Sequence, residues 1–245
     1  MLLGTDPPRL PVALLVSTTE LFGISEGTTR TALSRMAARG EVRNDDGRYE
    51  LAAPRLLSRQ ARQERSRAGR TDPWTPDDGW QMAVVDADGR RPADERAELR
   101  RALVGERLAE WRDGVWIRPA NLPVDRASLG GFPVEWGRAS LELDPIELAA
   151  RLWDLDGWAT TADALLDEMA ALFDDLDAGR REPLARGFVV SAAVLRHLQA
   201  DPLLPSTLVD ERWPGTVLRT AYERFDRAYR RVLRDWFDEH RDGGD

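Results

Sequence analysis

Hydroxyl and arginine side chains recur along residues 25–40, and they are the groups of this chain best suited to bind DNA. On a 3.6-residue helical period they lie on or near one face: Thr28, Thr31, Ser34, Arg35 and Arg39, with Arg30 on the flank. Arginine donates hydrogen bonds in a planar fork that fits phosphate and guanine, and hydroxyls bond to either. The next segment adds Arg43, Asn44 and Arg48. We therefore expect these side chains to contact DNA; a solvated helix face is the alternative interpretation of the same pattern.

The elements that must hold these side chains are a helix and a β-hairpin. Ser25 suits an N-cap and Gly40 suits the position after the last turn, so a helix is expected between them. Its inner face would be Thr29, Leu33, Met36 and Ala37. Strands are expected at 41–43 and 48–51, joined by a turn at 44–47. With an earlier helix over 11–21 and a turn at 22–24, in which Ile24 packs inward, this is the pattern of a winged helix-turn-helix.

The remainder predicts an α+β fold that is mostly helical. A strand at 80–86, a helix at 92–104 and a strand at 115–118 indicate a central sandwich of ferredoxin-like type. Helices are then expected at 144–155, at 160–176 with Thr160 or Thr161 as its cap, at 183–198, and from Trp213 onward. The third of these would bury Phe188, Val189, Ala192, Leu195 and Leu198. The expected domains are 1–54 (winged helix), 55–73 (arginine-rich linker), 74–143 (central domain) and 144–245 (helical domain).

Several stretches resemble one family in the same order along the chain. LFGISEGTTRTALSRMAARGEV, followed by GRYEL, resembles the N-terminal winged-helix region of the PaaX family of transcriptional repressors. DGWQMAVVD and RDGVWIRPANL resemble the middle domain of that family, which is similar to the CRISPR-associated Cas2 fold. DPLLPSTLVDERWPG and LRTAYERFDRAY resemble its C-terminal domain.

The resemblance implies a function. It implies a homodimeric repressor of a catabolic operon of the phenylacetate type, bound to a double-stranded DNA operator with inverted half-sites. It also implies release by an aryl-CoA thioester effector such as phenylacetyl-CoA. Arginines that could bind a CoA phosphate are Arg112, Arg118, Arg126, Arg138, Arg196 and Arg212.

The composition of the chain argues against several other classes of protein. The chain has no Cys and two His, so neither a disulfide framework nor an ordinary zinc site is expected, and a lone His197 is expected to be structural. We expect no catalytic or metal-binding residue, no membrane span, and a cytoplasmic protein. The net charge is −8, but residues 25–70 hold 11 Arg against 6 Asp and Glu, an excess of 11 − 6 = +5. This excess is expected on the reading helix, the wing and the following segment, where Arg55, Arg59, Arg62, Arg65, Arg67 and Arg70 either track phosphates or are solvated.

Two alternatives stay open at this point. Asp86 and Asp88, at the end of the first central strand, could belong to a metal-dependent nuclease of the Cas2 type, or could simply form a turn. The other alternative is a regulator that dimerises but does not hold DNA. It is suggested by Leu2-Leu3-Gly4, which looks like the tail of an opening helix whose earlier part we expect to be missing from this chain.

Overall fold

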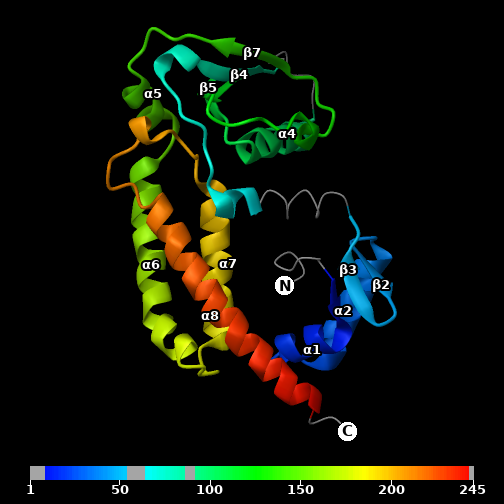
Figure 1. Ribbon diagram of the computed structural model, residues 1–245. Helices are drawn as coiled ribbons and strands as arrows, with labels where there is room; N and C mark the ends of the chain where they lie inside the picture. Colours follow the sequence, from blue (N-terminus) through cyan, green and yellow to red (C-terminus); the bar gives the residue numbers. More distant parts are fainter. Residues whose placement is uncertain (1–8, 54–63, 86–91, 243–245) are drawn as a thin grey trace. The chain divides into compact units, whose positions relative to one another are not determined.

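The structure is a computed structural model, and it describes residues 9–53, 64–85 and 92–242 (Figure 1). The chain divides into two compact units, each assembled from separate stretches of sequence. One unit consists of 1–67, 165–195 and 219–245, and the other of 68–164 and 196–218. The fold is α+β and mainly helical, as expected, with two small antiparallel sheets.

The N-terminal stretch of the first unit contains two helices and a three-stranded sheet. Its elements are β1 (Arg9–Pro11), α1 (Val12–Glu20), α2 (Glu26–Ala38), β2 (Val42–Asp45) and β3 (Arg48–Leu51). The sheet order is β1-β3-β2, with both pairs antiparallel. Leu15, Leu33, Val42 and Leu51 form the core between helices and sheet. The expected inner face of α2 is confirmed, because Thr29 and Leu33 are buried and Met36 and Ala37 pack against this core.

The hairpin turn is tighter than the sequence predicted. The register pairs Asp45 with Arg48, so only Asp46 and Gly47 lie between the strands. Their φ angles are +48° and +70°, as a two-residue turn of the primed type requires. Asn44 and Asp45, expected in the turn, therefore belong to β2. Ile24, expected to pack inward, is exposed, since it precedes the N-cap of α2 and lies outside the helix core.

The second unit is built on a four-stranded antiparallel sheet. Its elements include β4 (Trp80–Val84), α4 (Ala93–Gly105), β5 (Ala109–Arg112), β6 (Val115–Pro119) and β7 (Glu135–Ala139), with short 3-10 turns η2 (Pro76–Asp78) and η3 (Arg126–Leu129). The strand order is β5-β6-β4-β7. Side chains alternate across the sheet. One face packs with Leu99 and Leu103 of α4, and the other packs around Trp80 and Ile117 with α5.

The C-terminal helices are α5 (Pro145–Leu152), α6 (Leu155–Asp177), α7 (Leu184–Ala200) and α8 (Gly215–Asp242), with η4 (Ser206–Leu208) before α8. Asp144 caps α5 by accepting from the backbone N–H groups of Ile146 and Glu147 at 2.8 and 3.0 Å. The expected start of the next helix is wrong. Thr160 and Thr161 lie inside α6, where their hydroxyls donate to carbonyls four residues earlier.

The buried face of α7 also differs from the expectation. Val189 is exposed, whereas Val190, Val194 and Leu198 are buried at a spacing of four residues. A run of apolar residues such as 188–190 fits two overlapping helical stripes, and the packing partners in the folded chain select one of them.

Candidate nucleic-acid interface

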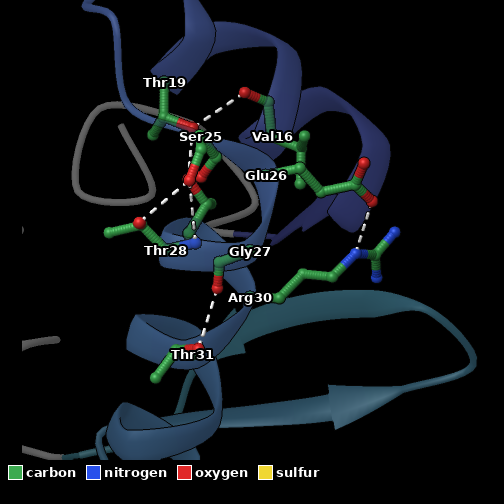
Figure 2. A network of polar contacts seen from close by, with 9 residues as sticks. Val16, Thr19, Ser25, Glu26, Gly27, Thr28, Arg30 and Thr31 are labelled. Atoms are coloured by element: carbon green, nitrogen blue, oxygen red, sulfur yellow. Dashed lines mark hydrogen bonds and ion pairs between the residues drawn. The ribbon is translucent and has the colours of Figure 1, made fainter.

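Local hydrogen bonding sets both ends of α2. The Ser25 hydroxyl accepts from the backbone N–H of Thr28 at 3.4 Å, as predicted for the N-cap (Figure 2). At the other end Gly40 has φ +67°, and its N–H donates to the Ala37 carbonyl at 2.9 Å. The N–H of Glu41 donates to the Met36 carbonyl, also at 2.9 Å. These last two bonds form a Schellman motif, so the helix must stop where the sequence predicted.

The inner side of α2 is tied to α1 through hydroxyl groups. Thr29 is 6% exposed, and its Oγ1 lies 2.5 Å from Oγ1 of Thr19. Gly23, with φ +71°, makes the turn between the helices. Because these contacts hold one side of α2 against α1, the opposite side of α2 faces solvent. All the side chains predicted to contact DNA are exposed: Thr28, Arg30, Thr31, Ser34, Arg35, Arg39, Arg43, Asn44 and Arg48.

The hydroxyls of this exposed side are already partly engaged. Thr31 donates to the Gly27 carbonyl at 2.8 Å, and the hydroxyls of Thr28 and Ser25 lie 3.0 Å apart (Figure 2). A threonine hydroxyl that donates within its own helix keeps its lone pairs free to accept. Thr31 can therefore accept a hydrogen bond from a base amino group without rearrangement.

The arginines fall into two classes that the sequence did not distinguish. Three are ion-paired with acids of the same stretch: Arg30 with Glu26 at 2.6 Å, Arg39 with Glu41 at 3.2 Å, and Arg43 with Glu50 at 3.0 Å. The side chains of Arg35 and Arg48 make no hydrogen bond or ion pair with any residue that the structure describes. These two cations can meet a nucleic acid without first losing a partner.

Sequence reasoning missed Arg9. Its Nη2 lies 2.9 Å from Oδ2 of Asp45, although the two residues are 36 positions apart. The contact exists because β1 and β2 flank β3, so that Arg9 faces Glu50 in the register and reaches across to the far strand. A three-residue strand ending in proline gave no usable sequence signal.

The charge of this region is distributed differently from the expectation. Residues 25–51 contain five arginines and five acidic residues, so their net charge is zero. The whole excess of +5 lies in residues 52–70, which have six arginines and one glutamate. The expectation of a basic reading helix and wing is therefore wrong. The basic segment is the one that follows them.

Part of that basic segment is bound within the first unit. Arg55, Arg59 and Arg62 lie outside the described residues. Arg67 forms an ion pair with Asp226 at 3.2 Å and lies over the ring of Tyr222, 5.5 Å from its centroid. Arg67 is therefore bound to side chains of α8 rather than simply solvated.

Two family models match this chain. The PaaX-like protein model matches residues 2–54, and the PaaX-like protein C-terminal domain model matches residues 153–240. Together they cover more than half of the sequence. The chain belongs to the PaaX-like family.

One solved structure is similar to this chain over nearly its whole length. The uncharacterized protein Rv0674 from Mycobacterium tuberculosis is 37% identical in sequence to this PaaX-like chain, with a TM-score of 0.71. The match covers 96% of this chain and 94% of that one. No curated protein matches the chain.

The arginines considered for an effector site differ in accessibility. Arg118 is 2% exposed and donates to the carbonyl of Glu106 at 3.0 Å and to the Asn121 side chain at 2.9 Å. Burial, reinforced by the neighbouring charge of Arg107, lowers the pKa of Arg118 to about 9. Arg118 therefore belongs to the interior of this PaaX-like chain. The remaining candidates are exposed: Arg112, Arg126, Arg138, Arg196 and Arg212.

His197 is part of an aromatic stack. Its ring lies 4.3 Å from that of Trp158, whose other stacking partner is Trp213 at 4.5 Å. Its Nε2 lies 3.0 Å from the Trp158 carbonyl oxygen. Burial lowers the pKa of His197 below its ordinary value. These contacts give His197 a packing role in the second unit.

Asp86 and Asp88, the residues of the nuclease alternative, lie outside the described residues, as does Leu2-Leu3-Gly4. Among the residues that the structure does describe, no group of three His, Cys, Asp or Glu side chains could hold a metal ion. Within the same residues, no helix is both long enough and apolar enough to span a membrane.

Proposed function

We propose that this PaaX-like chain is a DNA-binding transcriptional regulator and that residues 9–53 are its winged helix-turn-helix. In this proposal α2 is the recognition helix and the β2–β3 hairpin is the wing. The observation that carries the proposal is the exposed side of α2. It is held opposite a packed core and presents small hydroxyl side chains beside the unpaired Arg35. A recognition helix needs such a surface, because small side chains allow close approach to base edges and arginine reads guanine.

The central sheet supports a scaffold role. In chain order its strands are β4, β5, β6 and β7, so the spatial order β5-β6-β4-β7 is that of a ferredoxin-like sheet. The ferredoxin-like pattern has a helix between its last two strands, and in this chain η3 lies at that place. We propose that this central domain is Cas2-like and that, together with the C-terminal helices, it joins two copies of the chain. A dimer would place two recognition helices on inverted half-sites.

The regulator is proposed to be a repressor of a catabolic operon that an aryl-CoA thioester releases. Family membership and the exposed arginines Arg112, Arg126, Arg138, Arg196 and Arg212 support an anionic effector. Release requires that the effector bind more tightly to the conformation that does not hold DNA.

The test is a binding titration of the purified chain with its own upstream intergenic DNA and with random DNA, across a salt series. We expect preference for the upstream DNA and its loss on addition of phenylacetyl-CoA. Arg35→Ala should weaken binding to the preferred DNA by about 1–3 kcal/mol and relax specificity at one base position. Equal losses on preferred and random DNA would contradict a base-reading role for Arg35.

A further inference from the structure

Residues 9–53 have no excess of positive charge with which to attract DNA. Residues 9–53 contain six arginines and six acidic residues. Four of the arginines are held in ion pairs: Arg9 with Asp45, Arg30 with Glu26, Arg39 with Glu41, and Arg43 with Glu50. DNA-binding domains usually carry a basic excess, because non-specific affinity comes from cations that neutralise phosphates.

From this arrangement we propose that the paired acids, Glu26, Glu41, Asp45 and Glu50, make the domain discriminate against non-specific DNA. The inference rests on the proposed DNA-binding function and goes beyond it, because it assigns a role in specificity to acidic residues. Each of these carboxylates lies 2.6 to 3.2 Å from an arginine nitrogen. A phosphate that approaches one of these arginines therefore also meets a negative charge.

Of the four pairs, Arg30–Glu26 is the best suited to exchange when the correct sequence is present. In the Arg30–Glu26 pair both side chains are more than half exposed, at 55% and 54%. Exposed pairs of this kind are weak in water, so they hold an arginine without locking it. Base contacts made by the correct sequence can offset the loss of the pair, whereas random DNA offers phosphates without matching base edges.

Two arginines of residues 9–53, Arg35 and Arg48, are not paired with an acid of the described chain. Arg35 lies on α2, away from the buried Thr29 and Leu33, and Arg48 begins β3. Both can reach DNA without displacing an acid of the described chain. Discrimination then comes from two arginines that bind freely and four whose paired carboxylate a phosphate must approach or displace.

If the acids instead positioned their arginines for DNA, the expected effect of removing them would be the reverse. Nε of Arg30 donates to the Glu26 carboxylate, and the two terminal nitrogens of Arg30 have no partner in the contacts drawn (Figure 2). If Glu26 served to aim Arg30 at DNA, removal of the carboxylate would weaken binding to every sequence.

The experiment uses the full chain and two variants that neutralise a paired acid without changing its shape, Glu26→Gln and Glu50→Gln. Asp46→Asn is the matched control. Asp46 is exposed, lies at the tip of the β2–β3 hairpin that contains Glu50, and has no partner among the described residues. Asparagine tolerates its φ of +48°. The control therefore removes one negative charge without releasing an arginine.

Affinities are measured by fluorescence anisotropy for a duplex selected from a random pool by the wild-type chain and for an unselected duplex, across a salt series. Glu26→Gln and Glu50→Gln should each tighten binding to the unselected duplex about threefold or more. Each should also steepen its salt dependence by up to about 0.9 in log–log slope, the value for one added phosphate contact. Binding to the selected duplex should tighten less, so the specificity ratio falls. Asp46→Asn should change the ratio by a smaller factor.

Three results would overturn the inference. Equal effects of all three variants would mean that net charge acts alone, without a role for pairing. Weaker binding to both duplexes would assign the acids to arginine positioning. An unchanged specificity ratio in the variants, together with selective binding by the wild-type chain, would support DNA binding but contradict this role for the acids. If the wild-type chain selects no duplex, the proposed function itself fails, and this result is distinct from the other three.

Discussion

The Tyr229 hydroxyl provides a sharp test of the packing between α7 and α8. Tyr229 is 6% exposed, and its hydroxyl has no hydrogen-bond partner among the described residues. A buried polar group without a partner costs about 1–3 kcal/mol of folding free energy. Tyr229→Phe removes that group and keeps the ring, so we expect the variant to be more stable at neutral pH by about 1 kcal/mol. For a chain of this size this corresponds to a melting temperature about 2–4 °C higher.

The same substitution should change stability at alkaline pH. Burial, with a further contribution from Asp226, raises the pKa of Tyr229 from 10.0 to about 12. The folded state holds this proton more tightly than the unfolded state, so ionisation of Tyr229 destabilises the fold. The free energy of unfolding is unaffected by this ionisation below pH 10 and falls as the pH rises towards 12. At pH 11 the wild-type chain should have lost about 1.4 kcal/mol through this group, and Tyr229→Phe should have lost none of it.

Urea unfolding followed by tryptophan fluorescence at pH 7 and pH 11 measures both effects. The pKa of Tyr222 is also raised, mainly by burial, but this group is common to both chains and cancels in the difference. Tyr49→Phe is the control, since Tyr49 lies on β3 at the partly buried edge of another core. A loss of about 1 kcal/mol or more in Tyr229→Phe at pH 7 would refute the reasoning, because it would show that the hydroxyl is hydrogen-bonded after all.

Three further substitutions test other parts of the chain by urea or thermal unfolding. Ser25→Ala removes the N-cap of α2 and should cost about 1 kcal/mol; no measurable cost would mean that the cap is replaceable. Gly187→Ala places a methyl group 3.0 Å from the Tyr229 ring and should cost about 1 kcal/mol net, since crowding outweighs the helix propensity that alanine gains; a stabilised variant would show that the ring gives way. Asn121→Leu removes the acceptor of Arg118 Nη2 and the donor to the Leu203 carbonyl, both buried, and should cost about 3 kcal/mol; a neutral result would show that Nη2 finds another acceptor.

Elements whose ends depend on local chemistry were predictable. Ser25, Gly40 and Asp144 act through backbone groups within a few residues, so the bounds of α2 and the start of α5 follow from neighbouring sequence. The start of α6 was not predictable in this way. Thr160 and Thr161 suit a cap, but both are accommodated inside a helix by bonding to carbonyls four residues earlier.

The exposed face of the candidate DNA interface could also be predicted, whereas the state of its charges could not. Helical periodicity alone separates Thr31 and Arg35 from the buried Thr29 and Leu33. Whether an arginine is free depends on which acid lies beside it in space. Helical spacing brings Glu26 to Arg30, but only the order of three strands brings Asp45 to Arg9.

By itself, then, the sequence determined the family, the two helices and hairpin of the N-terminal part, and the side of α2 that faces outward. These depend on residue order and on interactions a few positions apart. The tertiary structure decided which arginines are paired and that Arg118 lies in the interior, where it bonds to Glu106 and Asn121. Burial and ion pairing depend on contacts between residues far apart in the chain. Many such contacts are compatible with the sequence, and the packing of the whole unit determines which of them form.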